Sequence, residues 1–191
     1  MVITIDGPAG AGKSTVARAV AERLGYRYVD TGLMYRELTA AAMERGVDPD
    51  DGDSLAALVG VAPSAQVDLR GEAVSARVSA VSRHPQVRTR MRERQRALAR
   101  DAVLEGRDTG SRVCPDADVK VYLTASLEAR AARRAADLGL AADDVGRTIA
   151  ARDRGDAEQL APAADAHVID TSGLTVSETM DAIVRLVEAA A

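Results

Sequence analysis

The segment Gly7-Pro8-Ala9-Gly10-Ala11-Gly12-Lys13-Ser14 constrains the fold of this chain more than any other feature. It follows a β-rich run at 2–5, precedes a helical pattern at 14–24, and matches the G-x-x-x-x-G-K-[ST] pattern of phosphate-binding loops. The glycines let main-chain N–H groups turn inward, and the following helix adds its positive N-terminal end. The segment therefore predicts a nucleoside-triphosphate site, in which Lys13 reaches the β and γ phosphates and the Ser14 hydroxyl ligates Mg²⁺.

Short apolar runs alternate with longer helical patterns along the rest of the chain. The runs indicate five short buried strands, at 2–5, 26–29, 102–104, 119–123 and 167–169. Helical patterns lie between and after them, at 14–24, 33–44, 87–100, 127–137 and 176–190. This alternation predicts an α/β fold of the P-loop NTP hydrolase type, with a five-stranded parallel sheet and helices on both faces. Ligands then gather at the carboxyl ends of the strands.

Two stretches fit this core poorly. Residues 46–83 hold Asp-rich turns and one weak alternation near 66–69, and residues 139–164 are polar, acidic and Arg-rich without a strand pattern. We expect both to be flaps on a single domain that spans 1–191. The expected parts are a core at 1–36, 84–138 and 165–191, a small insertion at about 37–83 and a short lid at about 139–164.

Composition excludes several functions. The chain has 23 Arg, two Lys and no Asn, so it lacks the Asn-Lys-x-Asp motif with which ordinary GTPases read guanine. Its single cysteine, Cys114, forms neither an intrachain disulfide nor a multi-cysteine metal site. A net charge of −4 argues against bulk nucleic-acid binding, and the apolar runs are too short to span a membrane. The N-terminus reads as a strand rather than a signal peptide, so we expect a cytoplasmic protein with no nucleic-acid or membrane partner.

The residues at the ends of the predicted strands indicate which acceptor receives the phosphate. The run at 119–123 ends in Thr124-Ala125-Ser126, without the acid that motor and switch ATPases carry after such a strand. A small-molecule kinase instead needs a second anion site built from arginines, together with flaps that exclude water. Arg36 follows the second predicted strand, and Arg107 and Asp108 follow the third. We expect the acceptor to bind there, beside the phosphate loop.

These segments together resemble bacterial cytidylate kinases. The resemblance runs from end to end and rests on four segments, namely residues 3–14, Asp30-Thr31-Gly32-Leu33-Met34-Tyr35-Arg36, Gly106-Arg107-Asp108-Thr109-Gly110 with Pro115-Asp116-Ala117, and Arg152-Asp153 ahead of Ala161-Pro162. The second and third segments in combination are specific to that family among P-loop kinases. The resemblance implies transfer of the ATP γ-phosphate to CMP or dCMP by a monomer, and it makes residues 37–83 an NMP-binding insertion.

The family's site carries over residue by residue. The ATP and Mg²⁺ contacts implied are Gly7, Pro8, Ala9, Gly10, Ala11, Gly12, Lys13, Ser14 and Thr15, with Ser14 as the metal ligand. The CMP contacts implied are Thr31, Arg36, Ser79, Arg88, Arg107, Asp108, Arg152 and Asp156. Of these, Thr31, Arg36 and Arg107 hold the CMP phosphate, Arg88, Asp108 and Ser79 read cytosine, and Asp156 bonds the sugar hydroxyls. Lys13, Arg107, Arg152 and Asp108 are the catalytic set.

Related kinases also place arginine fingers on the helix after the fourth strand, which makes Arg130 and Arg133 candidates beside the ATP phosphates. The chain departs from the family in its lid, where Gln159 stands at the position of a phosphate-binding Arg. Either Arg154 or Arg147 replaces that cation, or the acceptor is held with one cation fewer. Asp6, directly before the loop, either braces the loop or approaches Mg²⁺ through water.

Two other functions stay open at this point. One is another small-metabolite P-loop kinase, acting on shikimate, gluconate or dephospho-coenzyme A, for which an amine-reading acid such as Asp108 has no use. The other is a nucleotide-binding regulator or hydrolase, which has no use for Arg36 and Arg107 together.

Overall fold

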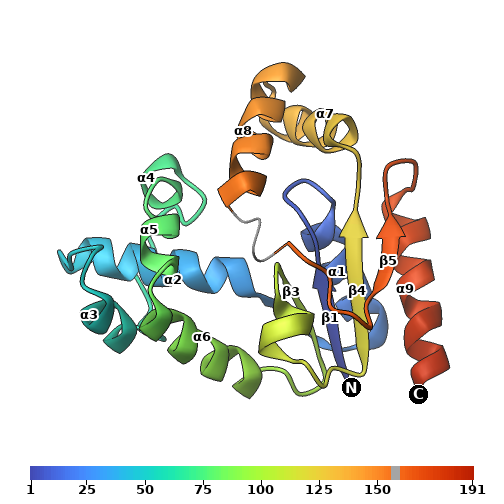
Figure 1. Cartoon of the computed structure of the whole chain (residues 1–191), viewed down its shortest axis with the longest axis horizontal. Coiled ribbons are helices and arrows are strands. Elements are labelled where there is room, and N and C mark those ends of the chain that lie inside the picture. The colour runs from blue at the N-terminus through green and yellow to red at the C-terminus, as the bar shows by residue number, and fades with distance from the viewer. Residues whose placement is uncertain (156–159) are drawn as a thin grey trace. The chain divides into compact units, whose positions relative to one another are not determined.

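The computed structural model describes residues 1–155 and 160–191, apart from the side chains of residues 137, 138 and 152. The chain divides into two compact units (Figure 1). Unit 1 comprises Met1–Val29 and Ala99–Ala191, and unit 2 comprises Asp30–Leu98. Unit 2 thus takes in more of the chain than the insertion expected at 37–83, and the domain boundaries drawn from the sequence stay a prediction.

Unit 1 is built on a five-stranded sheet with the strand order β2-β3-β1-β4-β5. The strands are β1 (Val2–Asp6), β2 (Arg27–Asp30), β3 (Ala102–Gly106), β4 (Val119–Thr124) and β5 (His167–Asp170). β1 pairs in parallel with β3 and β4, and β4 pairs in parallel with β5. The central position of β1 means that the loop after it opens between the ends of β3 and β4. The α/β class, the five predicted strands and their parallel pairing are confirmed. The burial predicted for all five is wrong for β5, because it lies at the edge of the sheet and exposes His167, Val168 and Asp170.

The core of unit 1 is aliphatic. Strand residues such as Ile3, Ile5 and Leu123 are fully buried, and α1 (Lys13–Leu24) and α9 (Val176–Ala190) pack against the sheet. The capping box expected at the start of α9 is present, because the Thr175 hydroxyl accepts from the Glu178 N–H while the Glu178 carboxylate accepts from the Thr175 N–H. A short π-helical turn, η1 (Thr109–Val113), follows β3 and lies against β1.

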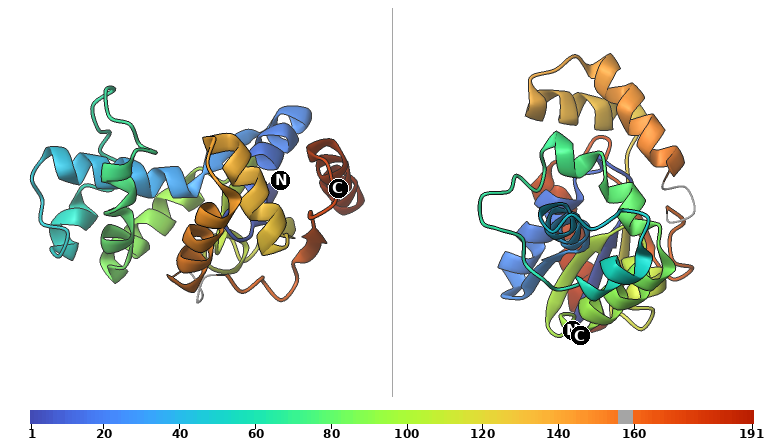
Figure 2. Two further views of the ribbon diagram at one scale, coloured as in Figure 1. Left: turned by 90° about the horizontal axis from the view of Figure 1, so that it is seen from above. Right: turned by 90° about the vertical axis from the view of Figure 1, so that its left-hand side faces the viewer.

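A helical hairpin follows β4. In it α7 (Leu127–Leu138) and α8 (Ala142–Gly155) lie side by side (Figures 1 and 2). Ala135, Val145 and Ile149 form their small apolar contact. The sequence pattern predicted α7 but not α8, which lies in the polar stretch 139–164. Only two large apolar residues of α8, Val145 and Ile149, lie one turn apart, and such a weak stripe is outweighed by the surrounding charges.

Unit 2 consists of helices, namely α2 (Thr31–Glu44), α3 (Gly52–Ala57), α4 (Glu72–Ser75), α5 (Val78–Ser82) and α6 (Pro85–Ala97). Its own apolar cluster joins Leu38 on α2, Leu55 on α3 and Met91 on α6. The predicted helices at 33–44 and 87–100 are confirmed with ends shifted by two or three residues. The weak alternation at 66–69 does not form a strand in this unit.

No helix in the described ranges is both long and apolar enough to cross a bilayer.

Candidate active site

The loop between β1 and α1 has a backbone that only glycine adopts readily. Gly7, Gly10 and Gly12 have positive φ values of 146°, 78° and 86°. At Gly7 a side chain is also excluded by space, because a Cβ there would lie 2.1 Å from the main-chain oxygen of Leu123 on β4. The loop is therefore fixed by its glycines and by its close approach to the sheet.

Side chains from four separate places hold the carbonyl groups of this loop. The donors are Arg107 to Gly7 O at 2.7 Å, Lys13 to Pro8 O at 2.8 Å, Arg130 to Ala9 O at 3.1 Å and Thr171 to Ala11 O at 3.2 Å. In a trans peptide the N–H points opposite to its C=O, and the chain has no cis peptide bond. The N–H groups of Ala9, Gly10 and Gly12 therefore face away from the side chains that hold the adjoining carbonyls, while the Ala11 N–H donates to Pro8 O at 3.4 Å. Main-chain N–H groups of a glycine-rich turn at the start of a helix are groups that can bind phosphate oxygens.

The Ser14 hydroxyl, at the start of α1, donates to the Glu105 carboxylate at 2.7 Å. Glu105 lies near the end of β3 and is 4% exposed. A hydroxyl and a carboxylate next to a phosphate loop are the hard oxygen donors that Mg²⁺ takes together with phosphate oxygens and water. The residues present thus fit the predicted metal. Ser14 was predicted for this role, whereas Glu105 was missed.

Asp6, the last residue of β1, braces the segment that carries Arg107 and Asp108. Its Oδ1 accepts from the N–H and the hydroxyl of Thr109 at 2.9 and 2.7 Å, and its Oδ2 accepts from the Gly110 N–H at 2.8 Å. Burial raises the pKa of Asp6 above its ordinary value, while these hydrogen bonds act in the opposite direction. Both carboxylate oxygens of Asp6 thus brace η1. Bracing is one of the two roles that the sequence left open for Asp6.

Arg107 and Asp108 follow β3 as predicted. Arg107 reaches Gly7 of the phosphate loop, and the Asp108 carbonyl accepts the first π-helical hydrogen bonds of η1. The Arg112 guanidinium lies 3.9 Å from the Asp108 carboxylate, which is about one-sixth exposed. The structure therefore brings one cation of the predicted CMP site into contact with the donor loop, with the acid directly after it in the chain.

The candidate fingers Arg130 and Arg133 both lie beside the loop. Arg130, on α7, is buried and reaches Ala9 of the loop, while Arg133 donates to the hydroxyl and the carbonyl of Thr171, whose hydroxyl in turn donates to Ala11. The Arg152 side chain and residue Asp156 lie outside the described part of the chain, as does Gln159.

Unit 2 carries the other predicted CMP residues. Asp30 caps α2 by accepting from the Leu33 N–H at 2.8 Å, and this places Thr31 on the first turn, where it is 6% exposed. Further along α2, the Arg36 guanidinium donates to Leu69 O and to the Ser75 hydroxyl, each at 2.9 Å. Both of these acceptors are neutral, and a phosphate outcompetes neutral acceptors for a guanidinium.

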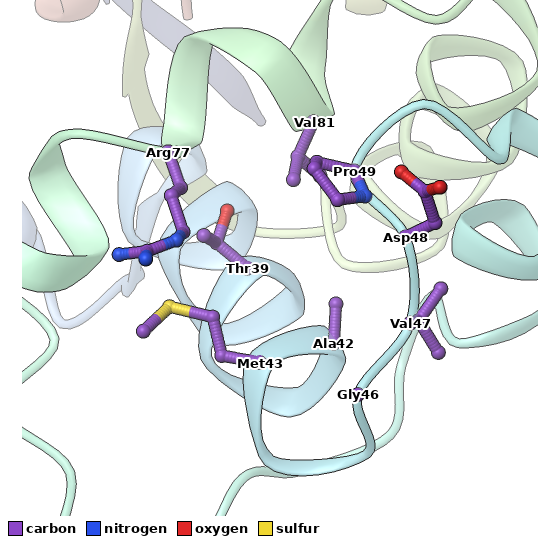
Figure 3. A pocket seen from close by; sticks show the side chains of 9 residues that line it. All are labelled: Thr39, Ala42, Met43, Gly46, Val47, Asp48, Pro49, Arg77 and Val81. Carbon is purple, nitrogen blue, oxygen red and sulfur yellow. The ribbon is translucent and has the colours of Figure 1, made fainter.

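Two of the three base-reading candidates, Ser79 and Arg88, lie on later helices of unit 2, whereas Asp108 belongs to unit 1. Ser79 is exposed on α5, and Arg88 is half-buried on the first turn of α6. A cavity of about 510 Å³ in this unit has a different position (Figure 3). Its wall is mostly apolar, with Met43, Val81 and Arg77 around it, and it contains none of the predicted CMP residues. We therefore locate the candidate acceptor site by its arginine side chains, which can bind a phosphate, and not by the position of this cavity.

Comparison with known protein families gives a match over almost the whole chain. The family model described as cytidylate kinase matches residues 3–189. The chain belongs to the cytidylate kinase family.

Individual relatives agree with that membership. The chain is 46% identical to a cytidylate kinase from Geobacillus thermodenitrificans, over 97% of this chain and 95% of the relative, and 42% identical to one from Streptomyces avermitilis, over 98% and 93%. The second alignment has 214 positions against 191 residues here, so this chain lacks segments that the relative has. Among solved structures, a gluconokinase from Sinorhizobium meliloti matches with a TM-score of 0.55 at 19% identity, covering 99% of this chain and 93% of that one, which shows the shared fold alone.

Sequence reasoning missed several groups of this site. Glu105 was overlooked because an acid was sought after the strand at 119–123, while the strand at 102–104 is the one that runs into Glu105. Thr171 and Asp153 become visible only through contacts with Ala11 and Arg130, far away in the sequence.

Proposed function

We propose that this cytidylate kinase transfers the γ-phosphate of ATP to CMP or dCMP, giving ADP and CDP or dCDP. The observation that carries the proposal is Arg107, which follows β3 and donates at 2.7 Å to Gly7 of the phosphate loop. A guanidinium in this position lies between the donor loop and the segment that carries Asp108, and so serves the donor and the acceptor together. Family membership and the names of the relatives support the same activity.

On the donor side, main-chain N–H groups of the loop and the positive end of α1 bind the β and γ phosphates. Lys13 exchanges its present contact with Pro8 for the phosphate oxygens, because a charged acceptor is the stronger partner for an ammonium group. Ser14, with Glu105 behind it, holds Mg²⁺, which balances charge on the phosphates when bound.

On the acceptor side, Thr31, Arg36 and Arg107 hold the phosphate of CMP, and Arg88, Asp108 and Ser79 contact cytosine. The Asp108 carboxylate accepts from the exocyclic amine of the base. In uracil a carbonyl oxygen stands at that place and faces the carboxylate oxygen, acceptor against acceptor, which disfavours its binding. Arg152 and Asp156 complete the site from the lid.

The reaction needs no strong general base, since the nucleophile is an ionised oxygen of the CMP phosphate. That oxygen forms a bond to Pγ while the bond from Pγ to the oxygen bridging to Pβ breaks, and ADP leaves with the electron pair. The cations Lys13, Arg107, Arg130 and Arg152 stabilise the charge on the transferring group, and the lid excludes water.

A monomeric state, a cytoplasmic location and the absence of nucleic-acid or membrane partners stay predictions of the sequence. Size-exclusion chromatography with light scattering tests the monomer, with one chain of 20.0 kDa expected.

The test of the function is a coupled assay of ADP release with CMP, dCMP, UMP, AMP, GMP, shikimate and gluconate as acceptors. We expect CMP and dCMP to stimulate release far above the rate with ATP alone. Stimulation by shikimate or gluconate without stimulation by CMP would mean a different small-molecule kinase. ADP release that no acceptor changes would mean a hydrolase or regulator.

The role of Asp108 has its own test. Asp108→Asn replaces the acceptor carboxylate by an amide that presents either a donor or an acceptor. We expect slower turnover of CMP and a preference for CMP over UMP reduced by about tenfold or more. An unchanged preference would show that another residue reads the base.

A further inference from the structure

Arg130 is a buried cation beside the phosphate loop. Two nitrogen atoms of its guanidinium, Nε and NH1, donate hydrogen bonds to described residues. Nε donates to Ala125 O at 3.1 Å, at the end of β4. NH1 donates both to Ala9 O of the loop at 3.1 Å and to the Asp153 carboxylate at 2.6 Å. Among the described residues, NH2 has no hydrogen-bond acceptor, so two of the five N–H groups stay available to a phosphate.

Asp153 comes from the lid helix α8 and is the anionic partner of this buried arginine. The two side chains, Arg130 and Asp153, are 9% and 20% exposed. A buried guanidinium without a counter-charge is costly, so a carboxylate at this place keeps Arg130 folded against the loop before any nucleotide binds. Gly10 leaves room for the arginine, since a Cβ at Gly10 would lie 3.0 Å from the Arg130 Cβ.

The second oxygen of the Asp153 carboxylate takes no part in the ion pair with Arg130. Oδ1 is buried and accepts no hydrogen bond from the described residues. A buried carboxylate oxygen without a donor is destabilising, so the geometry of this pair is not the one that stability alone favours. The carboxylate is instead placed where one oxygen fixes NH1 of Arg130 and leaves the NH2 edge open.

We propose that Asp153 is a positioning residue for phosphoryl transfer: it orients the Arg130 guanidinium so that NH2 meets the phosphates of ATP. The inference rests on the proposed kinase function and deepens it, because it assigns a role to a lid carboxylate that contacts neither substrate. It predicts that loss of Asp153 lowers the rate of transfer rather than the binding of CMP.

The test compares Asp153→Asn with Asp144→Asn, since Asp144 lies on the same helix and pairs with Arg147 at the surface. With ATP and CMP at saturation, we expect D153N to lower kcat by about tenfold to a hundredfold, as expected for a misoriented catalytic group, with KM for CMP changed less than about twofold. Asp153→Glu, which keeps the charge, restores part of kcat. D144N retains the wild-type kcat.

A double-substitution cycle decides whether Asp153 acts through Arg130. In an Arg130→Ala background, D153N is expected to cause no further loss of kcat. The doubly substituted chain has neither charge of the pair, so it can still be measured if D153N alone fails to fold. A further loss in that background, a kcat for D153N equal to that of D144N, or tighter ATP binding with faster turnover in D153N would each overturn the proposal. Failure of the proposed function looks different, since the wild-type chain then shows no CMP-dependent ADP release.

Discussion

The phosphate loop of unit 1 and the Arg36 region of unit 2 hold their cations in different ways. In unit 1, Arg107 and Arg130 donate to loop carbonyls that are 100 and 121 residues away in the sequence. In unit 2, Arg36 donates to Leu69 and Ser75, 33 and 39 residues away, on a surface of short helices. The phosphate loop is thus tied to the buried sheet, whereas the proposed CMP-binding residue Arg36 depends on a small local fold.

This difference has a physical consequence. The loop carbonyls are held in place by groups anchored in the core, so the N–H groups that bind phosphate are oriented before ATP arrives, and little ordering is required on binding. Arg36 first has to exchange its contacts with Leu69 and Ser75 for a phosphate. We therefore expect substitutions at the donor site to affect the binding of ATP and the rate of transfer, and those at Arg36 to affect mainly the binding of CMP.

The largest expected effect is that of Lys13, and the chain offers a matched control in its only other lysine, Lys120. Lys13→Met removes the charge next to the transferring phosphate, and we expect kcat to fall by roughly a thousandfold with little change in thermal stability. Lys120, buried on β4, donates to Pro115 O and pairs with Asp165 at 2.7 Å. Lys120→Met therefore lowers the melting temperature but leaves kcat in the wild-type range, and the reverse pattern would contradict the assignment.

The second prediction distinguishes the roles of Arg36 and Arg107, the two arginines proposed to bind the CMP phosphate. Arg36→Ala is expected to raise KM for CMP by about a hundredfold while the affinity for ATP stays unchanged. Arg107→Ala weakens CMP binding to a similar extent and also weakens ATP binding, because it removes the donor to Gly7 O. Initial rates over a grid of ATP and CMP concentrations measure both. Equal effects of the two variants on ATP binding would remove the distinction between the two regions.

The third prediction concerns the bracing of η1 by Asp6. Asp6→Asn places an amide against the N–H groups of Thr109 and Gly110, and we expect the free energy of unfolding to fall by about 1–3 kcal/mol. Because burial raises the pKa of Asp6, the folded state binds a proton at this carboxylate more tightly than the unfolded state does. The stability linked to that proton is therefore present at low pH. It is lost as the pH rises through the raised pKa.

Urea unfolding of both chains between about pH 4 and pH 8 checks this prediction. The stability advantage of the wild-type chain over D6N should shrink as the pH rises. An advantage that grows with pH would show that the hydrogen bonds, rather than burial, dominate the pKa of Asp6.

The smallest effect is expected in the lid, where the family cation is replaced by Gln159. Arg154 stands next to Asp153, which holds that turn of α8 against Arg130, whereas Arg147 lies about two turns back and pairs with Asp144. We therefore expect Arg154→Ala to raise KM for CMP by about fivefold or less, and Arg147→Ala to leave it unchanged. If neither variant changes KM, the acceptor is held with one cation fewer.

The donor side could be predicted from the sequence largely because its residues are adjacent: a contiguous run from Gly7 to Ser14 contains the glycines, the lysine and the hydroxyl. The groups that support the run could not be predicted. Thr171 and Arg130 reach the loop only after β4 and β5 have paired beside β1, and no local pattern in the sequence records such a contact.

Element boundaries explain two other omissions. The strand predicted at 102–104 stops one residue before Glu105, so Glu105 was not considered. The polar composition of α8 gave no helix prediction there, so the contact between Asp153 on α8 and Arg130 was not expected. The roles of Thr31, Arg36, Ser79 and Arg88 rest on the family resemblance and on their places in unit 2, and they stay predictions until the variants are measured.

Product analysis tests the central claim most directly. The chain is incubated with ATP and Mg²⁺, with and without CMP, and ADP and CDP are quantified together by chromatography. Phosphoryl transfer to CMP predicts that CDP and ADP appear in a one-to-one ratio and that almost no ADP forms without CMP. ADP formed at the same rate in both reactions, with no CDP, would contradict it.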